Sequence, residues 1–170
     1  TIASVDARSG TDLVTYRGGY GSWTAWTANA AVDLGAGTAT GFGAALNAEN
    51  AHGGDGDDTL TGSAADNRLY GYGGNDTIAG LAGNDTLWGF ADDDSISGGA
   101  DDDSIDGGAG TNTLAGGTGD DDYVFFDSAQ TDTVNENPGE GDDRLDFAYV
   151  TGAAVTVTLN GSIHAEVNGS

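Results

Sequence analysis

A large apolar residue recurs at every ninth position through the middle of the chain. These positions are Leu60, Leu69, Ile78, Leu87, Ile96, Ile105, Leu114 and Tyr123. A glycine repeats with the same period, at positions 53, 62, 71, 80, 89, 98, 107 and 116. Residues 53–124 therefore divide into eight nonapeptides without insertion or deletion, and we number their positions places one to nine, starting from the glycine. A short fixed period of this kind is typical of solenoid proteins.

Each nonapeptide predicts a tight turn followed by a short strand. Glycines at places one, two and four allow the positive φ angles and the close backbone approach of a six-residue turn. Places seven to nine, with the apolar residue in the middle, then form a strand of three residues. Place six is always aspartate or asparagine: Asp58, Asn67, Asp76, Asp85, Asp94, Asp103, Asn112 and Asp121.

Two nonapeptides complete one coil if successive strands lie on opposite sides of the molecule. Residues 18 apart then stack at about 4.8 Å, so place eight supplies an inward column on each side and place six forms two rows of turns. We therefore predict an all-β fold: a right-handed parallel β-roll, a β-solenoid with two nonapeptides per coil, with irregular β caps at both ends.

The residues before the repeat, 1–52, carry strand signals without a regular period and are expected to form the N-terminal flanking and capping strands. The signals are a strand at 12–16 and a hairpin formed by 31–34 and 38–40 around a glycine-rich turn. Residues 1–52, the repeat and the C-terminal residues are expected to make one continuous structural domain.

The residues after the repeat, 125–170, predict the capping strands of the other end. The sequences at 131–134 and 142–147 keep the Asp-x-apolar core of the repeat, although their spacing is looser. A last strand is expected at 155–159, where valine and leucine alternate with threonine.

The charge of the chain excludes several classes of partner. Twenty-eight acidic residues against four arginines give a formal net charge of −24, which disfavours nucleic acid and anionic membranes and favours a cationic ligand. There is no cysteine, and no apolar run approaches the roughly 20 residues of a membrane span. The chain starts without methionine or a signal peptide, so we expect neighbouring domains in a larger parent protein.

Catalytic motifs are weak. The two histidines, His52 and His164, are isolated, and no His-Glu-x-x-His or Gly-x-Ser-x-Gly motif occurs. Paired aspartates resemble a glycosidase dyad, but metal ligation explains them better. We therefore expect no enzymatic activity in these residues.

Stacked turns with an aspartate from each coil suit a hard divalent cation. Calcium takes six to eight oxygen ligands from carboxylates and backbone carbonyls, whereas magnesium demands stricter octahedral geometry and retains waters. Unneutralised carboxylates about 5 Å apart would repel each other. The sequence therefore predicts calcium between the turns.

The repeat resembles the calcium-binding RTX (repeat-in-toxin) β-roll, also known as the hemolysin-type repeat, over residues 53–124. The resemblance implies about four to six calcium ions, each held between turns two nonapeptides apart by place-six side chains and backbone carbonyls. The implied complete pairs are Asp58/Asp76, Asp76/Asp94, Asp85/Asp103 and Asp103/Asp121. Besides the eight place-six residues, the expected ligand positions are Gly54, Gly56, Gly74, Gly83, Asp92 and Asp101 in the turns.

Some positions depart from the family pattern. Asn67 and Asn112 lack a charge, so their sites are expected to bind more weakly. Asp92 and Asp101 stand where place four is usually glycine, in a conformation that aspartate adopts less easily. Glu49, nine residues before Asp58, is a candidate for an early start of the column.

The resemblance also implies a function. It implies a structural module that folds on calcium binding after type I secretion and stabilises a larger secreted, extracellular or cell-surface bacterial protein. The alternative from another class is a module that binds a polysaccharide, a surface or ice through an outward face of the roll.

Two outward faces are candidates for that alternative. Tyr70, Tyr72, Trp88 and Phe90 are expected to form one aromatic cluster, and the other face is rich in hydroxyls: Thr59, Thr61, Thr77, Ser95, Ser97 and Thr113. The aromatic-rich segment 16–26 is expected to fold back over the aromatic cluster, in place of a glycan or protein ligand.

Overall fold

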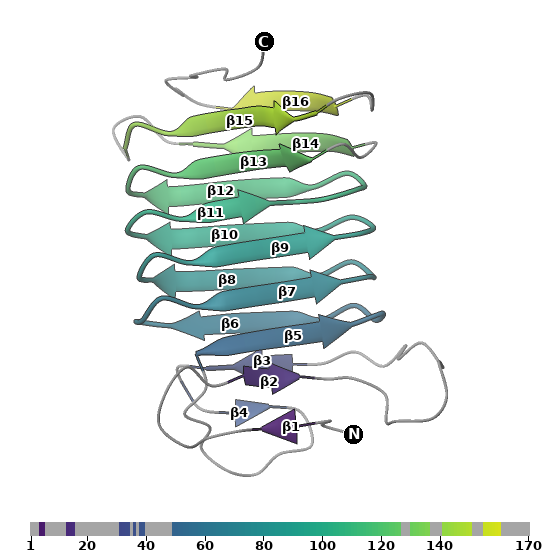
Figure 1. Ribbon diagram of the computed structural model, residues 1–170, viewed down its shortest axis with the longest axis vertical. Coiled ribbons are helices and arrows are strands. Elements are labelled where there is room, and N and C mark those ends of the chain that lie inside the picture. The colour runs from purple at the N-terminus through teal and green to yellow at the C-terminus, as the bar shows by residue number, and fades with distance from the viewer. Residues whose placement is uncertain are drawn as a thin grey trace.

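The computed structural model describes residues 4–5, 13–15, 31–34, 36, 38–39, 49–126, 130–136, 141–150 and 155–160. These residues form two facing β-sheets (Figure 1), and none of them forms a helix long and apolar enough to cross a membrane. In spatial order the first sheet contains β1 (Ser4–Val5), β2 (Leu13–Thr15), β5 (Asn50–Gly54), β7 (Arg68–Tyr72), β9 (Thr86–Phe90), β11 (Ser104–Asp106), β13 (Asp122–Phe126) and β15 (Arg144–Tyr149). The second contains β4 (Thr38–Ala39), β3 (Ala31–Asp33), β6 (Thr59–Ser63), β8 (Thr77–Ala82), β10 (Ser95–Ala100), β12 (Thr113–Thr118), β14 (Gln130–Asn135) and β16 (Val155–Asn160).

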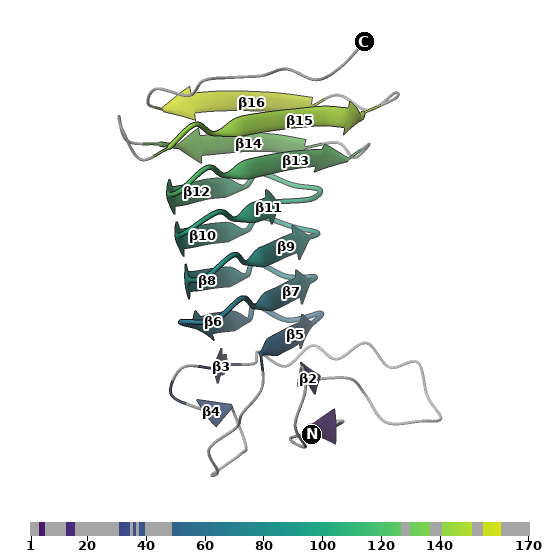
Figure 2. The same ribbon diagram turned by 60° about the vertical axis from the view of Figure 1, so that its left-hand side comes forward.

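The chain alternates between the sheets at every strand from β5 to β16, and among these strands the neighbours within each sheet are parallel. In the repeat the register between neighbouring strands is two nonapeptides, as in the pairing of Leu60 with Ile78. The coils rise in a right-handed sense from the N-terminal to the C-terminal end (Figures 1 and 2). The predicted parallel β-roll with two nonapeptides per coil is therefore confirmed.

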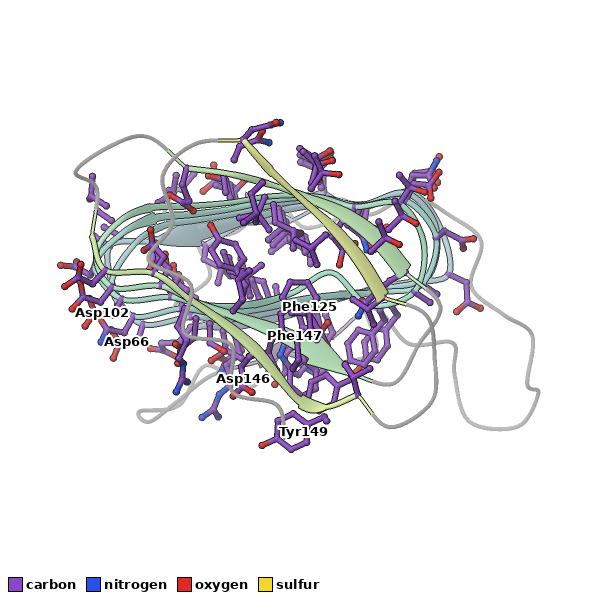
Figure 3. The ribbon with its side chains drawn as sticks, turned by 90° about the horizontal axis from the view of Figure 1, so that it is seen from above. Asp66, Asp102, Phe125, Asp146, Phe147 and Tyr149 are labelled. Atoms are coloured by element: carbon purple, nitrogen blue, oxygen red, sulfur yellow. The ribbon has the colours of Figure 1, made fainter. Side chains whose placement is uncertain are left out.

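The core is the narrow space between the sheets. All eight place-eight residues are buried, each at most 2 % exposed. Val32 continues the column of the second sheet at its N-terminal end, and Val134 continues it at the C-terminal end. At the same C-terminal end Phe125 and Phe147 stack between the sheets (Figure 3), with ring centroids 4.6 Å apart.

The strands of the repeat are mostly longer than the predicted three residues. β6 to β10 and β12 have five or six residues, because the ladder continues through places one and two of the next nonapeptide. β11 alone of the repeat strands has three. Glycine at place one is compatible with a strand here because its extended backbone stays hydrogen-bonded to neighbouring coils.

The flanks continue the roll at both ends. The predicted hairpin is confirmed by the antiparallel pairing of β3 with β4, while β2 is parallel to β5. Beyond residue 124 the stacking continues with steps longer than two nonapeptides, since Leu114 pairs with Val134 and Tyr123 pairs with Leu145. The predicted last strand is β16, which pairs with β14. The segment 16–26, predicted to cover the aromatic cluster, lies outside the described residues.

Candidate calcium sites

The place-six side chains form two columns along the edges of the roll. The first column, at turns from the first sheet to the second, contains Asp58, Asp76, Asp94 and Asn112; the second, at the opposite turns, contains Asn67, Asp85, Asp103 and Asp121. All eight are at most 3 % exposed. The structure thus brings together the side chains that the sequence paired, while their role as metal ligands stays a prediction.

Each side chain is fixed by the coil before it in the chain. The backbone N–H of Asp58 donates to Oδ1 of Asp76 at 2.7 Å, and the same bond joins Asp76 to Asp94, Asp85 to Asp103 and Asp103 to Asp121. One carboxylate oxygen of each aspartate is therefore used to hold neighbouring coils in register.

The second oxygen of these carboxylates is buried without a hydrogen bond. Among the described residues, Oδ2 of Asp76, Asp85, Asp94, Asp103 and Asp121 accepts none. A buried carboxylate oxygen without a hydrogen bond destabilises the fold unless a cation binds to it or the carboxylate is protonated.

These oxygens lie where the place-one glycine has no side chain. A Cβ added to Gly71 would lie 2.0 Å from Oδ2 of Asp76 and 3.0 Å from the carbonyl oxygen of Gly89 in the next coil. The geometry recurs at Gly80, with Oδ2 of Asp85 at 2.1 Å and the Gly98 carbonyl oxygen at 2.7 Å. Place one must be glycine because any Cβ would collide with this pair of oxygens. We call the glycine, the Oδ2 atom and the carbonyl oxygen together a turn cradle.

Burial in the cradles raises the pKa of the aspartates. It raises the pKa of Asp76 from 3.8 to about 8, although the hydrogen bond from the Asp58 backbone opposes it. Burial also raises the pKa of Asp94 and Asp103 to about 7, and of Asp85 and Asp121 to about 6. A cation would remove this penalty, because it favours the ionised form.

The two asparagine turns lack this orphaned oxygen. Asn67 accepts a hydrogen bond from the Ser63 backbone through Oδ1 and donates through Nδ2 to the Glu49 carbonyl oxygen. Asn112 accepts from the Asp94 backbone and donates to the Gly108 carbonyl oxygen and to Oδ1 of Asp132. An amide therefore satisfies the same turn without a cation. Glu49 does lie one coil before Asn67, as expected, but its backbone carbonyl makes the contact.

Four of the expected ligand positions, all at place four, have left-handed backbones. Gly74, Gly83, Asp92 and Asp101 have φ values of +96°, +94°, +75° and +74°. Asp92 and Asp101 each gain a contact there, because their Oδ2 atoms accept from the N–H of Gly74 and Gly83 at 3.2 Å. The Gly56 carbonyl oxygen lies under Gly74, and the Gly54 carbonyl oxygen accepts from the N–H of Gly73.

Sequence reasoning missed the contribution of the place-five side chains, which form rows of their own beside the two place-six columns. These exposed side chains also join coils, but in the opposite direction: Oδ1 of Asp57 accepts from the Asn75 N–H at 2.9 Å, and Oδ1 of Asp102 accepts from the Asp120 N–H at 2.9 Å. Asp66 and Asp102 point outward at one turn edge (Figure 3). The signal was present, since place five is aspartate or asparagine in seven of eight units.

The aspartate columns also extend beyond the repeat. Asp132 continues the first column through its bond with Asn112, and its own Oδ2 is buried without a hydrogen bond. Asp143 continues the second column, since its Oδ1 accepts from the Asp121 N–H at 3.1 Å. The Asp-x-apolar motifs at 131–134 and 142–147 were the signal that could have identified both residues.

The donor set fits a hard cation that takes backbone oxygens. Each cradle offers one carboxylate oxygen and one carbonyl oxygen, and no three His, Cys, Asp or Glu side chains of the described residues group around a common metal position. Calcium accepts both kinds of oxygen as ligands. These features define a parallel β-solenoid with oxygen-lined, negatively charged turns.

Comparison with known proteins finds one family model that matches the repeat. The model of the RTX calcium-binding nonapeptide repeat, four copies long, matches residues 52–87 and again residues 88–123. No curated protein matches the chain. Residues 52–123 therefore match RTX repeats, which indicate a calcium-binding structural module, and the parallel β-solenoid of the described residues fits an RTX β-roll.

The outward aromatic residues form a ladder on the first sheet. Tyr70 stacks on Trp88 and Tyr72 on Phe90, with centroids 5.2 and 4.9 Å apart, and the two stacks meet edge to face. The predicted four-residue cluster is confirmed, and His52 extends it. These contacts occupy ring faces that stacking on a sugar would need, so the geometry indicates cross-strand stabilisation.

The opposite sheet carries the predicted hydroxyl face. Thr59, Thr77, Ser95 and Thr113 are exposed and pair in register from coil to coil. Thr61 and Ser97 lie in the adjacent row, where alanines interrupt them. Ice or surface binding by either face stays a prediction.

Proposed function

We propose that calcium binding drives the folding of this β-roll, which then acts as a structural module of a larger protein. The observation that carries the proposal is the set of buried Oδ2 atoms that accept no hydrogen bond, each beside a carbonyl oxygen of the next coil in the regular turn cradles. Four to six ions between the turns would neutralise these carboxylates. An ion present at a hundred times its dissociation constant stabilises the folded state by about 2.7 kcal/mol per site.

The charge of the chain supports coupled folding. A net charge of −24 opposes compaction unless cations bind. Extracellular calcium modules have dissociation constants on the order of 10⁻⁴ to 10⁻³ M, so the chain would remain unfolded in a cell and fold outside it. This behaviour suits a chain exported through a type I secretion channel by a bacterium, with any catalytic activity in neighbouring domains.

A calcium titration followed by far-UV circular dichroism tests the proposal. We expect β-structure to appear cooperatively with calcium and to be lost in EDTA. Magnesium at the same concentration should not replace calcium. A matched pair of variants locates the effect: Asp85→Asn removes a cradle oxygen and should raise the calcium midpoint, whereas Asp66→Asn removes an exposed charge from the preceding turn on the same edge and should change it little. Complete β-structure in EDTA at neutral pH would refute the proposal.

A further inference from the structure

The C-terminal end of the second column holds an acidic side chain where the repeat has glycine. Glu136 follows Gly116 by the 20-residue step that pairs β12 with β14, so it occupies the place-one position of the next coil. Its side chain is 4 % exposed, and its Oε1 accepts from the Gly116 N–H at 3.0 Å and from the Tyr123 hydroxyl.

The cradle beneath Glu136 contains an unsatisfied carboxylate. A Cβ on Gly116 would lie 2.1 Å from Oδ2 of Asp121. Asp121 is 1 % exposed, and this oxygen accepts no hydrogen bond from the described residues. Two buried carboxylates, from Asp121 and Glu136, therefore lie against the same glycine, where two negative charges would repel each other without a cation.

The equivalent position in the first column makes a matched comparison. There Phe125 takes the place-one position one coil after Gly107, and the place-six residue is Asn112, whose amide is fully hydrogen-bonded. Phe125 is 1 % exposed and stacks on Phe147. The chain thus places an apolar ring over the neutral turn and a carboxylate over the charged one.

We infer that Asp121 and Glu136 bind a divalent cation near the C-terminal end of the second column, with Glu136 supplied from outside the repeat that the family model covers. Glu136 adds a carboxylate to the cradle at Gly116, where a regular cradle has a glycine at the place-one position of the next coil. Calcium affinity rises with the number of charged ligands, so this site fills before the others. Tyr123, where the other seven repeats have leucine or isoleucine, is a positioning residue that holds Glu136 through its hydroxyl.

Counting bound calcium by equilibrium dialysis tests the site. Glu136→Gln keeps an oxygen that can accept from Tyr123 and Gly116, and we expect it to bind one ion fewer per chain at low free calcium. Asp142→Asn, which removes an exposed charge near the same turn, is the control and should bind as the unmodified chain does. Equal ion numbers and affinities for the unmodified chain and Glu136→Gln would overturn the inference.

A second variant covers the case in which Glu136→Gln fails to fold. Tyr123→Phe keeps both carboxylates and should weaken the tightest site by about tenfold or more; unchanged affinity would overturn the inference. The inference rests on the proposed calcium binding, but the number of ions bound distinguishes a failure of the inference from a failure of the proposed function. If the repeats did not bind calcium, the unmodified chain would bind at most the one ion of this site, which Glu136→Gln would still remove.

Discussion

The aspartate turns and the asparagine turns of this roll have the same backbone but different chemistry. In both, the place-six side chain is buried and joined to a neighbouring coil. Asn67 and Asn112 satisfy their polar atoms within the protein, whereas Asp85 and Asp103 leave Oδ2 without a hydrogen bond. The fold itself therefore does not require a carboxylate at place six, and the proposed cation would account for the aspartates.

The largest expected effect is that of pH on the calcium-free chain. The raised pKa values, about 8 for Asp76 and about 7 for Asp94 and Asp103, mean that the folded chain binds more protons than the unfolded chain above pH 3.8. Stability without calcium must then fall as pH rises from about 4 to 8. Circular dichroism in EDTA should show β-structure near pH 4 and its loss by pH 8. Rising stability over this range would contradict the burial of these carboxylates.

Replacing the asparagine of a turn by aspartate should give that turn a calcium site and make it unfavourable without calcium. Asn67→Asp should add one calcium ion per chain, because the cradle at Gly62 already has the Gly80 carbonyl oxygen beside it. In EDTA near pH 5, where the calcium-free roll is expected to keep β-structure, the same change should destabilise it by on the order of 1–3 kcal/mol, through the buried charge. Dialysis and urea unfolding measure the two effects. The control Asn75→Asp alters an exposed place-five residue, and a gain of an ion there would contradict the cradle assignment.

Substitutions of aspartates within one column should raise the calcium midpoint by different amounts, depending on how many complete pairs each aspartate belongs to. Asp76 belongs to two complete pairs, with Asp58 and Asp94, whereas Asp58 belongs to one. Asp76→Asn should therefore raise the calcium midpoint more than Asp58→Asn, by the equivalent of up to about 2.7 kcal/mol for one lost ion. Calcium titrations of the two variants compare them directly. Equal shifts would show that ions are not shared between turns of successive coils.

The sequence was sufficient for the coil and insufficient for the chemistry of its turns. A fixed period of nine predicted the columns of Leu60 and Asp58, because stacked strands preserve register. The period alone could not reveal Asp132 or Asp143, which only their Asp-x-apolar motifs indicate, since the longer steps after residue 124 break the period while strand pairing is kept. Nor could it show that Gly71 is required by the Asp76 carboxylate, because that contact depends on which rotamer fills the turn.

The smallest expected effect concerns backbone strain at place two. Tyr72 and Leu81 both have φ of +85°, where bulky residues are disfavoured. Leu81→Gly should relieve about 1–2 kcal/mol of backbone strain. Two costs oppose this gain: the conformational entropy of glycine, about 0.5–1 kcal/mol, and the loss of the Leu81 side chain, which is 50 % exposed. Thermal unfolding in saturating calcium should show a change of at most a few degrees.

Tyr72→Gly is the matched comparison for Leu81→Gly. It relieves the same strain but also removes the stack on Phe90 and the hydroxyl contact with His52. An aromatic pair contributes about 0.5–1.5 kcal/mol beyond its buried area, so Tyr72→Gly should lower the melting temperature where Leu81→Gly leaves it nearly unchanged. Equal effects of the two variants would mean that the aromatic ladder does not stabilise the stacking of the coils, and that its half-buried rings need another explanation.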